Sequence, residues 1–236
     1  MEPVFYFPRE LMKGNPLLVD FLSEKEQGKY EVSIDKYTGK AKDNLNTPQN
    51  ASNLLKILQL NQAGIPTATI PEIISAARNG MNLSKVYVDG REVLLSGECS
   101  YVQNKFLAEQ LIKKLKLTVQ ETPYIIKGLG IRQSDSKDAY YGLEFITKNA
   151  EVISTSDFHH KNNGRKFSTI NPDYSIEFDK NGKYTLFTRD NILSRLCVNR
   201  DRGLNSRNDH LADSYGNGRV VVITSAEGAQ KFLQES

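Results

Sequence analysis

Polar and apolar residues alternate with a period of two along the middle of the chain, from Pro123 to Phe187. Short alternating runs bounded by Asn, Asp, Ser and Gly are typical of strands joined by tight turns. Connections this short leave no room for parallel crossovers, so the pattern predicts an antiparallel meander. The predicted strands cover residues 124–127, 140–147, 151–155, 165–170, 175–179 and 183–188.

Two Gly-containing pairs inside alternating segments indicate hairpins. Asn181-Gly182 separates the last two strands of the meander, and Asp89-Gly90 interrupts the run 85–95. Both pairs tolerate positive φ at the two central positions of a hairpin turn. Further strands are predicted at Val4–Phe7, Tyr30–Asp35 and Val220–Ile223, which are short alternating or apolar runs.

Helical spacing dominates residues 50–80. Leu54, Leu55 and Leu58 lie on one face of a first helix, and Thr69-Ile-Pro-Glu72 reads as a capping box that opens a second. The pair also has roughly the spacing of a DNA-binding helix-turn-helix. The recognition helix of that motif offers donors and cations from its N-terminal end, whereas Pro71 and Glu72 occupy it here. The sequence therefore favours a plain helical hairpin.

Three more helices are predicted. The strongest, Tyr101–Leu117, has an apolar stripe and lysines in its last turn, which complement the helix dipole. Arg189–Val198 has the spacing of a short helix, and a final amphipathic helix follows Ser225. Residues 199–218 are polar and irregular, which predicts a long loop.

These elements predict an α+β fold with an N-terminal helical hairpin region and a largely antiparallel β-sheet region closed by a C-terminal strand and helix. We expect a strand and loop segment at 1–48, a mainly helical region at 49–118, and the sheet region with an arginine-rich loop at 119–236. The pattern leaves open whether these regions form one domain.

Composition narrows the class of protein. Among 236 residues, 39% are hydrophobic and 25% are charged, which is typical of a globular chain and not of a disordered one. No apolar run approaches the ~18 residues that a membrane helix needs, and no secretory signal is visible, so we expect a cytoplasmic protein without membrane contact. Two cysteines, Cys99 and Cys197, are too few for a disulfide framework and predict buried free thiols.

Arginines cluster between residues 189 and 219. Guanidinium groups suit two-pronged contacts with phosphate or carboxylate, so the cluster predicts an anion-binding or nucleic-acid-binding loop. Six arginines against four aspartates, however, leave this window at net +2, and an internal lattice of ion pairs explains the pattern equally well. The candidate ligand-binding residues are Arg189, Arg195, Arg200, Arg202, Arg207 and Arg219.

Histidines and carboxylates give the second candidate. If the loop folded over the sheet, His159 or His160 could meet Asp209 and His210 around a divalent metal, with Asp209 and His210 as the catalytic pair of a hydrolase. A weaker nuclease hypothesis uses Glu144 and Lys148, which lie on the same face of a predicted strand. A carboxylate and a lysine on a sheet can together bind a metal ion and water.

Most catalytic signatures are missing: there is no Walker phosphate loop, no Gly-x-Ser-x-Gly elbow and no His-Glu-x-x-His helix. The sequence therefore favours a non-enzymatic protein that binds an anionic partner, nucleic acid included, through the arginine-rich loop. The alternative is a metal-dependent hydrolase or nuclease that uses histidine and aspartate. No cofactor is implied, and the oligomeric state is not determined.

Overall fold

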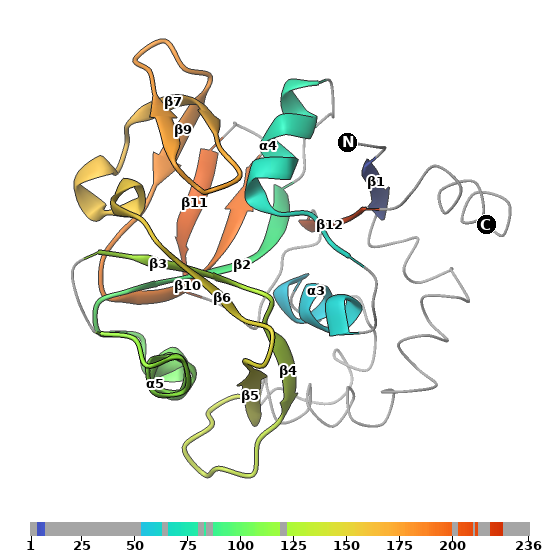
Figure 1. Cartoon of the computed structure of the whole chain (residues 1–236), viewed down its shortest axis with the longest axis vertical. Helices are drawn as coiled ribbons and strands as arrows, with labels where there is room; N and C mark the ends of the chain where they lie inside the picture. Colours follow the sequence, from blue (N-terminus) through green and yellow to red (C-terminus); the bar gives the residue numbers. More distant parts are fainter. Residues whose placement is uncertain are drawn as a thin grey trace, which may run out of the picture.

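The computed structural model describes residues 4–7, 53–62, 66–79, 83, 87–118, 122–199, 203–209, 211 and 218–223. Its centre is a curled sheet of ten strands (Figure 1). Eight strands follow one another in the order β1-β12-β2-β10-β11-β9-β7-β8, and β3 and β6 branch from β2. The strands are β1 (Val4–Phe7), β2 (Tyr87–Ser96), β3 (Tyr124–Lys127), β6 (Glu151–Ser154), β7 (Lys166–Ile170), β8 (Ile176–Phe178), β9 (Tyr184–Phe187), β10 (Ile192–Val198), β11 (Gly203–Asn208) and β12 (Gly218–Ile223).

Three α-helices and a small two-stranded sheet complete the described part of the chain. The helices are α3 (Asn53–Gln62), α4 (Ile70–Arg78) and α5 (Val102–Leu115), and the small sheet pairs β4 (Gly130–Gln133) with β5 (Leu143–Ile146). Two 3₁₀ turns, η2 (Ser156–Phe158) and η3 (His160–Asn162), precede β7. None of the described helices is long and apolar enough to cross a lipid bilayer.

The sheet is mixed, and the predicted fold class is wrong. β12 runs parallel to β2, and β11 runs parallel to β9, whereas the other pairs are antiparallel. The fold is mostly β instead of a helical region beside an antiparallel sheet. The error has a physical cause: turn signals report local connections, but the neighbours of β2 in the sheet come from distant parts of the chain.

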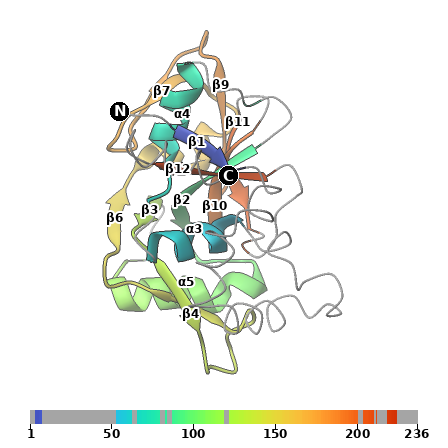
Figure 2. The same cartoon turned by 90° about the vertical axis from the view of Figure 1, so that its right-hand side faces the viewer.

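The central strands are covered on both faces, and their residues alternate between two hydrophobic clusters. On β2, Val88 and Leu94 belong to the cluster that contains α4, β7 and β9, while Val93 and Leu95 belong to the one that contains α3, α5, β4 and β5. This is the period of two expected of a strand. Figures 1 and 2 both show α4 and β7 on one side of β2 and α5 and β4 on the other.

β2 is a single strand, so the hairpin predicted at Asp89-Gly90 is wrong. One edge of β2 pairs with β10 along almost its full length, and the other is shared between β12 and β3. Gly90 packs closely against the start of α4: a Cβ at this position would lie 2.7 Å from Cγ1 of Ile70. Asp89 is buried because it is paired with Arg195. Both residue types are common in turns, but here both residues are buried within β2.

The predicted helical hairpin is also wrong as a packing unit. Both helices form, and the capping box of Thr69 and Glu72 is confirmed in α4. However, buried residues of α3 lie in one hydrophobic cluster and those of α4 in the other. Each helix therefore packs on the sheet instead of on its neighbour.

Two predictions near the C-terminus are corrected. The segment predicted as a helix at 189–198 contains β10, in which all seven residues are buried. Helical spacing and a buried strand cannot be told apart in so short an apolar run. Part of the loop predicted at 199–218 is the strand β11, which pairs with β10 and β9.

The connection at Asn181-Gly182 is not a hairpin. β8 and β9 do not pair with each other; β7 lies between them and pairs with both. The connection crosses β7 so closely that a Cβ at Gly182 would lie 2.8 Å from the Cα of Phe167. Glycine is needed here for close approach of two backbones.

Other predictions are confirmed. Strands form within or at the predicted ranges 4–7, 124–127, 140–147, 151–155, 165–170, 175–179, 183–188 and 220–223, and α5 forms within 101–117. Cys197 is a buried free thiol, and Cys99 is a half-buried one. The predicted strand at 30–35, the turn-rich segment around residues 38–48 and the C-terminal helix lie outside the described residues.

Candidate metal centre

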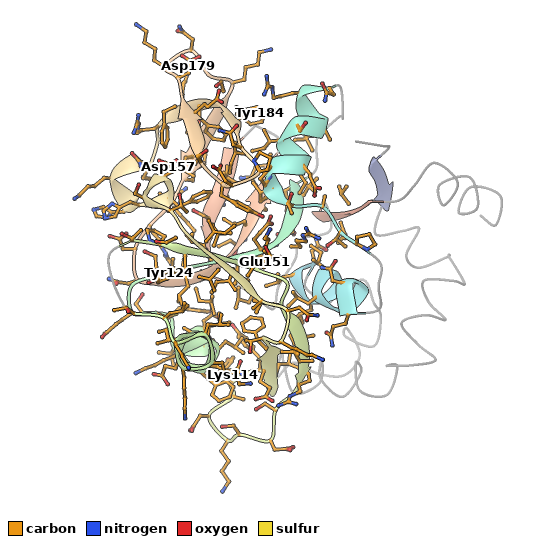
Figure 3. The ribbon with its side chains drawn as sticks, viewed as in Figure 1. Lys114, Tyr124, Glu151, Asp157, Asp179 and Tyr184 are labelled. Atoms are coloured by element: carbon orange, nitrogen blue, oxygen red, sulfur yellow. The ribbon has the colours of Figure 1, made fainter. Side chains whose placement is uncertain are left out.

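The two neighbouring histidines lie in the turn that joins β6 to β7, and this turn is fastened to the β9–β10 connection. Thr188 Oγ1 donates to the carbonyl of Phe158 at 2.7 Å, and the Thr188 amide donates to Asn163 Oδ1 at 3.1 Å. Asp157, labelled in Figure 3, accepts the Ile176 amide at 2.7 Å and ties the turn to β8. The turn that carries the histidines is therefore anchored both to the β9–β10 connection and to β8.

The opposing segment, Arg189–Asn191, is fastened to the start of α5. The amide and hydroxyl of Ser100 both donate to the carbonyl of Asn191, at 2.9 and 3.0 Å. Asn191 has a left-handed φ of 54°, which asparagine tolerates better than most residues. The turn brings Asp190 up to the histidines.

His159, His160 and Asp190 form the cluster. Each offers one possible ligand atom, and these atoms lie within 4.8 Å of one another. Nδ1 of His160 is in direct contact with a carboxylate oxygen of Asp190, Oδ2. The imidazole rings of the two histidines have centroids 4.2 Å apart and planes inclined by 37°.

The donor set matches a transition metal. Imidazole nitrogen is a ligand for zinc, copper, iron and nickel, and a carboxylate completes many such sites. A tetrahedral ion with bonds of about 2 Å holds its ligand atoms about 3.4 Å apart, so small side-chain rotations close the present spacing. Oδ1 of Asp190 is buried and has no hydrogen-bond partner among the described residues.

His159 imposes a condition on metal binding. Its Nδ1 accepts the amide of Lys161 at 3.2 Å. Neutral imidazole that accepts at Nδ1 bears its proton on Nε2. Ligation through either nitrogen therefore breaks this hydrogen bond, whose length lies at the upper end of the ordinary range.

The predicted metal ligands are only partly brought together. The structure places His159 and His160 side by side, but Asp209 forms an ion pair with Arg189, and its backbone carbonyl accepts the side chain of Asn104. His210 lies outside the described residues. Asp190, not Asp209, is the carboxylate beside the histidines.

Sequence reasoning missed Asp190, although a signal existed. The predicted strands 165–170 and 183–188 correspond to β7 and β9, which pair antiparallel. Such pairing places the residues before β7 beside those after β9, and Gly164 indeed donates to the carbonyl of Leu186 at 2.7 Å. A prediction of strand pairing would have brought residues 159–160 to residue 190.

The three described arginines of the predicted cluster have different contacts. Arg195 is 1% exposed and pairs with Asp89 at 2.7 Å, while Asp89 also accepts the Asn53 amide group at 2.9 Å. Burial alone would lower the pKa of Arg195, but the Asp89 carboxylate raises it above its ordinary value.

Arg189 is paired with Asp209, and the exposed Arg207 lies over the ring of Phe187 at 4.8 Å. The side chains of Arg200, Arg202 and Arg219 lie outside the described residues. Binding of an anion through the cluster therefore stays a prediction.

A second buried carboxyl lies inside β2. Glu92 is 0% exposed, and its Oε1 accepts the Ile70 amide at 2.9 Å and the hydroxyl of Tyr174. Burial raises the pKa of Glu92 from 4.5 to about 7, and these hydrogen bonds oppose the rise. Tyr174 has a left-handed φ of 67°, rare for an aromatic residue, and its hydroxyl bond fixes this turn to the sheet. Glu92 thus joins the start of α4 to the β7–β8 turn.

Glu144, the carboxylate of the weaker nuclease hypothesis, forms ion pairs and a hydrogen bond at the surface of the small sheet. Its carboxylate contacts Arg132 and lies 3.8 Å from Lys114, which is labelled in Figure 3, and it accepts Gln110 at 3.0 Å. These contacts link α5 to β4 and β5. The arrangement is that of a surface ion-pair network.

Comparison of the chain with protein-family models, curated proteins and solved structures finds no match. The function must therefore be inferred from the geometry of the chain itself.

Proposed function

We propose that this protein binds a divalent transition-metal ion, with zinc as the best fit, through His159, His160 and Asp190. The observation that supports this most is the convergence of two imidazoles and one carboxylate within 4.8 Å. They come from two segments that are joined through Thr188, and the segment with Asp190 is also fastened to the residue before the start of α5. Three protein ligands leave a coordination position for water, as in metal sites that exchange ligands.

Titration calorimetry with ZnCl₂ tests the proposal. We expect one ion per chain, and His160→Ala and Asp190→Asn should each weaken binding by at least about tenfold. Because protons compete with the ion for imidazole nitrogen, affinity should fall as the pH is lowered. Circular dichroism of each variant verifies that the fold is retained.

The controls are Asp209→Asn and His210→Ala, which remove the carboxylate and histidine that the sequence pattern indicates. Zinc affinity should not change in either. Loss of binding in these two variants with retention in Asp190→Asn would contradict the proposed ligand set. Absence of stoichiometric binding in the unmodified protein would contradict it entirely.

The sequence also suggested a metal-dependent hydrolase or nuclease, and hydrolysis at this ion stays a prediction. A metal with an open position lowers the pKa of bound water and supplies a nucleophile. Among the described residues, however, the neighbouring carboxylates are engaged: Asp157 accepts a backbone amide, and Asp209 pairs with Arg189. We therefore propose metal binding without assigning a reaction.

Binding of a nucleic acid through the arginines is supported by one contact, the exposed Arg207 over Phe187. Guanidinium and aromatic groups together suit bases and phosphates. Filter binding of single-stranded RNA at several salt concentrations tests it. Retention that is salt-dependent and reduced in Arg207→Ala is the expected result, and retention indifferent to both would contradict it.

A further inference from the structure

An open groove of about 350 Å³ lies between the C-terminal end of α4 and the connection from β8 to β9. In Figure 3, Asp179 marks the outer tip of this connection, and Tyr184 lies on its α4 side. The volume is at the lower end of the range for small-molecule sites, about 300–1,000 Å³. Its polar lining residues are Arg78, Ser168, Asp179, Asn181, Lys183 and Tyr184.

Both rims of the groove are preformed. On one rim, the Gly182 amide donates to the carbonyl of Asp179 at 2.8 Å, and Gly182 itself is pressed against Phe167. On the other, the capping box fixes the start of α4, and the Asn79 amide closes its last turn by donating to Ser75 and Ala76 carbonyls at 3.1 Å. Preformed walls lower the entropy cost of binding.

The groove has a cation on each side. Arg78 ends α4, and Lys183 lies on the β8–β9 connection; both are exposed. Within the described part of the chain, neither has an ion-pair or hydrogen-bond partner for its charged group. Many other described cations do have such partners, among them Lys105, Lys114, Lys127, Arg132, Arg189 and Arg195.

The acceptors in the groove are arranged differently. Oδ1 of Asp179 accepts the Asn181 amide at 2.9 Å, which leaves its second oxygen for a ligand donor. Ser168 donates its hydroxyl proton to the carbonyl of Glu177 at 3.2 Å, so its oxygen can accept. The groove therefore offers two cations to the anionic group of a ligand. Next to them, the Asp179 carboxylate and the Ser168 hydroxyl oxygen can accept hydrogen bonds from hydroxyl groups of the same ligand.

We propose that this groove binds a small phosphate monoester with free hydroxyl groups, such as a sugar phosphate. The planar fork of Arg78 suits two phosphate oxygens, and the Lys183 ammonium supplies a point charge from the opposite rim. Asp179 accepts a hydroxyl of the same ligand. The groove and the metal cluster use different elements, so each proposal stands without the other.

Titration calorimetry in buffer containing EDTA tests the groove independently of metal binding. The probes are glucose 6-phosphate, glycerol 3-phosphate, inorganic phosphate, unphosphorylated glucose and citrate. We expect saturable binding of the two phosphate esters, weaker binding of inorganic phosphate and none of glucose. The double variant Arg78→Ala/Lys183→Ala should weaken ester binding at least tenfold, and Asp179→Asn should reduce the preference for esters over inorganic phosphate.

Lys180→Ala is the matched control, because Lys180 is exposed on the same turn but does not line the groove. Its affinity for glucose 6-phosphate should equal that of the unmodified protein. Both cations replaced in the double variant are exposed, so the fold should survive, and circular dichroism verifies this. Absence of ester binding, binding unchanged in the double variant, or binding of citrate alone would each overturn the proposal.

Discussion

Replacing Glu92 by glutamine should remove a pH dependence from the stability of the fold. Glutamine has the shape of the protonated carboxyl, and its oxygen can still accept the Ile70 amide and the Tyr174 hydroxyl that contact Oε1. Oε2 is buried without a hydrogen-bond partner among the described residues, so ionisation places a charge where solvent cannot reach it. The variant keeps the contacts and loses the charge.

The magnitude follows from the pKa of Glu92, which burial raises from 4.5 to about 7. Between these two pH values, the folded chain binds a proton that the unfolded chain has released. The contribution of this group is fully present below pH 4.5 and is lost as the pH rises through 7. Each pH unit corresponds to about 1.4 kcal/mol, so the free energy of unfolding should fall by about 3 kcal/mol across the window.

Urea denaturation followed by circular dichroism at pH 5, 6, 7 and 8 measures this effect. The difference in unfolding free energy between Glu92→Gln and the unmodified protein should shift by about 3 kcal/mol in favour of the variant from pH 5 to pH 8. Other titrating groups cancel in that difference. Glu98→Gln, an exposed glutamate just beyond the end of β2, is the control and should show no shift. Parallel pH profiles for Glu92→Gln and the unmodified protein would refute the reasoning.

Three other substitutions test the fold. Asp89→Ala leaves the charge of Arg195 buried without its carboxylate and should cost about 3–5 kcal/mol in urea denaturation; an effect under 1 kcal/mol would show that the pair is not buried. Gly182→Ala forces a Cβ into the backbone of Phe167 and should lower the melting temperature clearly, so an unchanged melting temperature would contradict the crossover. Thr69→Ala removes the acceptor of the capping box and should cost about 1 kcal/mol, and no loss of stability would speak against that cap.

Local sequence patterns predicted the positions of individual strands better than they predicted which strands pair in the sheet. The runs at 124–127, 151–155 and 183–188 correspond to β3, β6 and β9 because alternation and turn residues report the conformation of a few neighbouring residues. Parallel pairing of β12 with β2 depends on residues more than a hundred positions apart, and no turn signal reports it. The same limit explains why the sequence pattern, which predicts a helix over Arg189–Val198, does not identify Asp190 as a neighbour of His160.

The errors at β2 share one cause. Asp89 and Gly90 have turn character, and Glu92 has surface character, yet all three are buried in the longest described strand. Their partners are remote in sequence: Arg195 lies 106 residues from Asp89, and Tyr174 lies 82 residues from Glu92. A buried charge is tolerated only where such a partner compensates it, so the polar residues of β2 become interpretable once the pairing is known. The same pairing accounts for the burial of Arg195, whose charge is compensated by the Asp89 carboxylate.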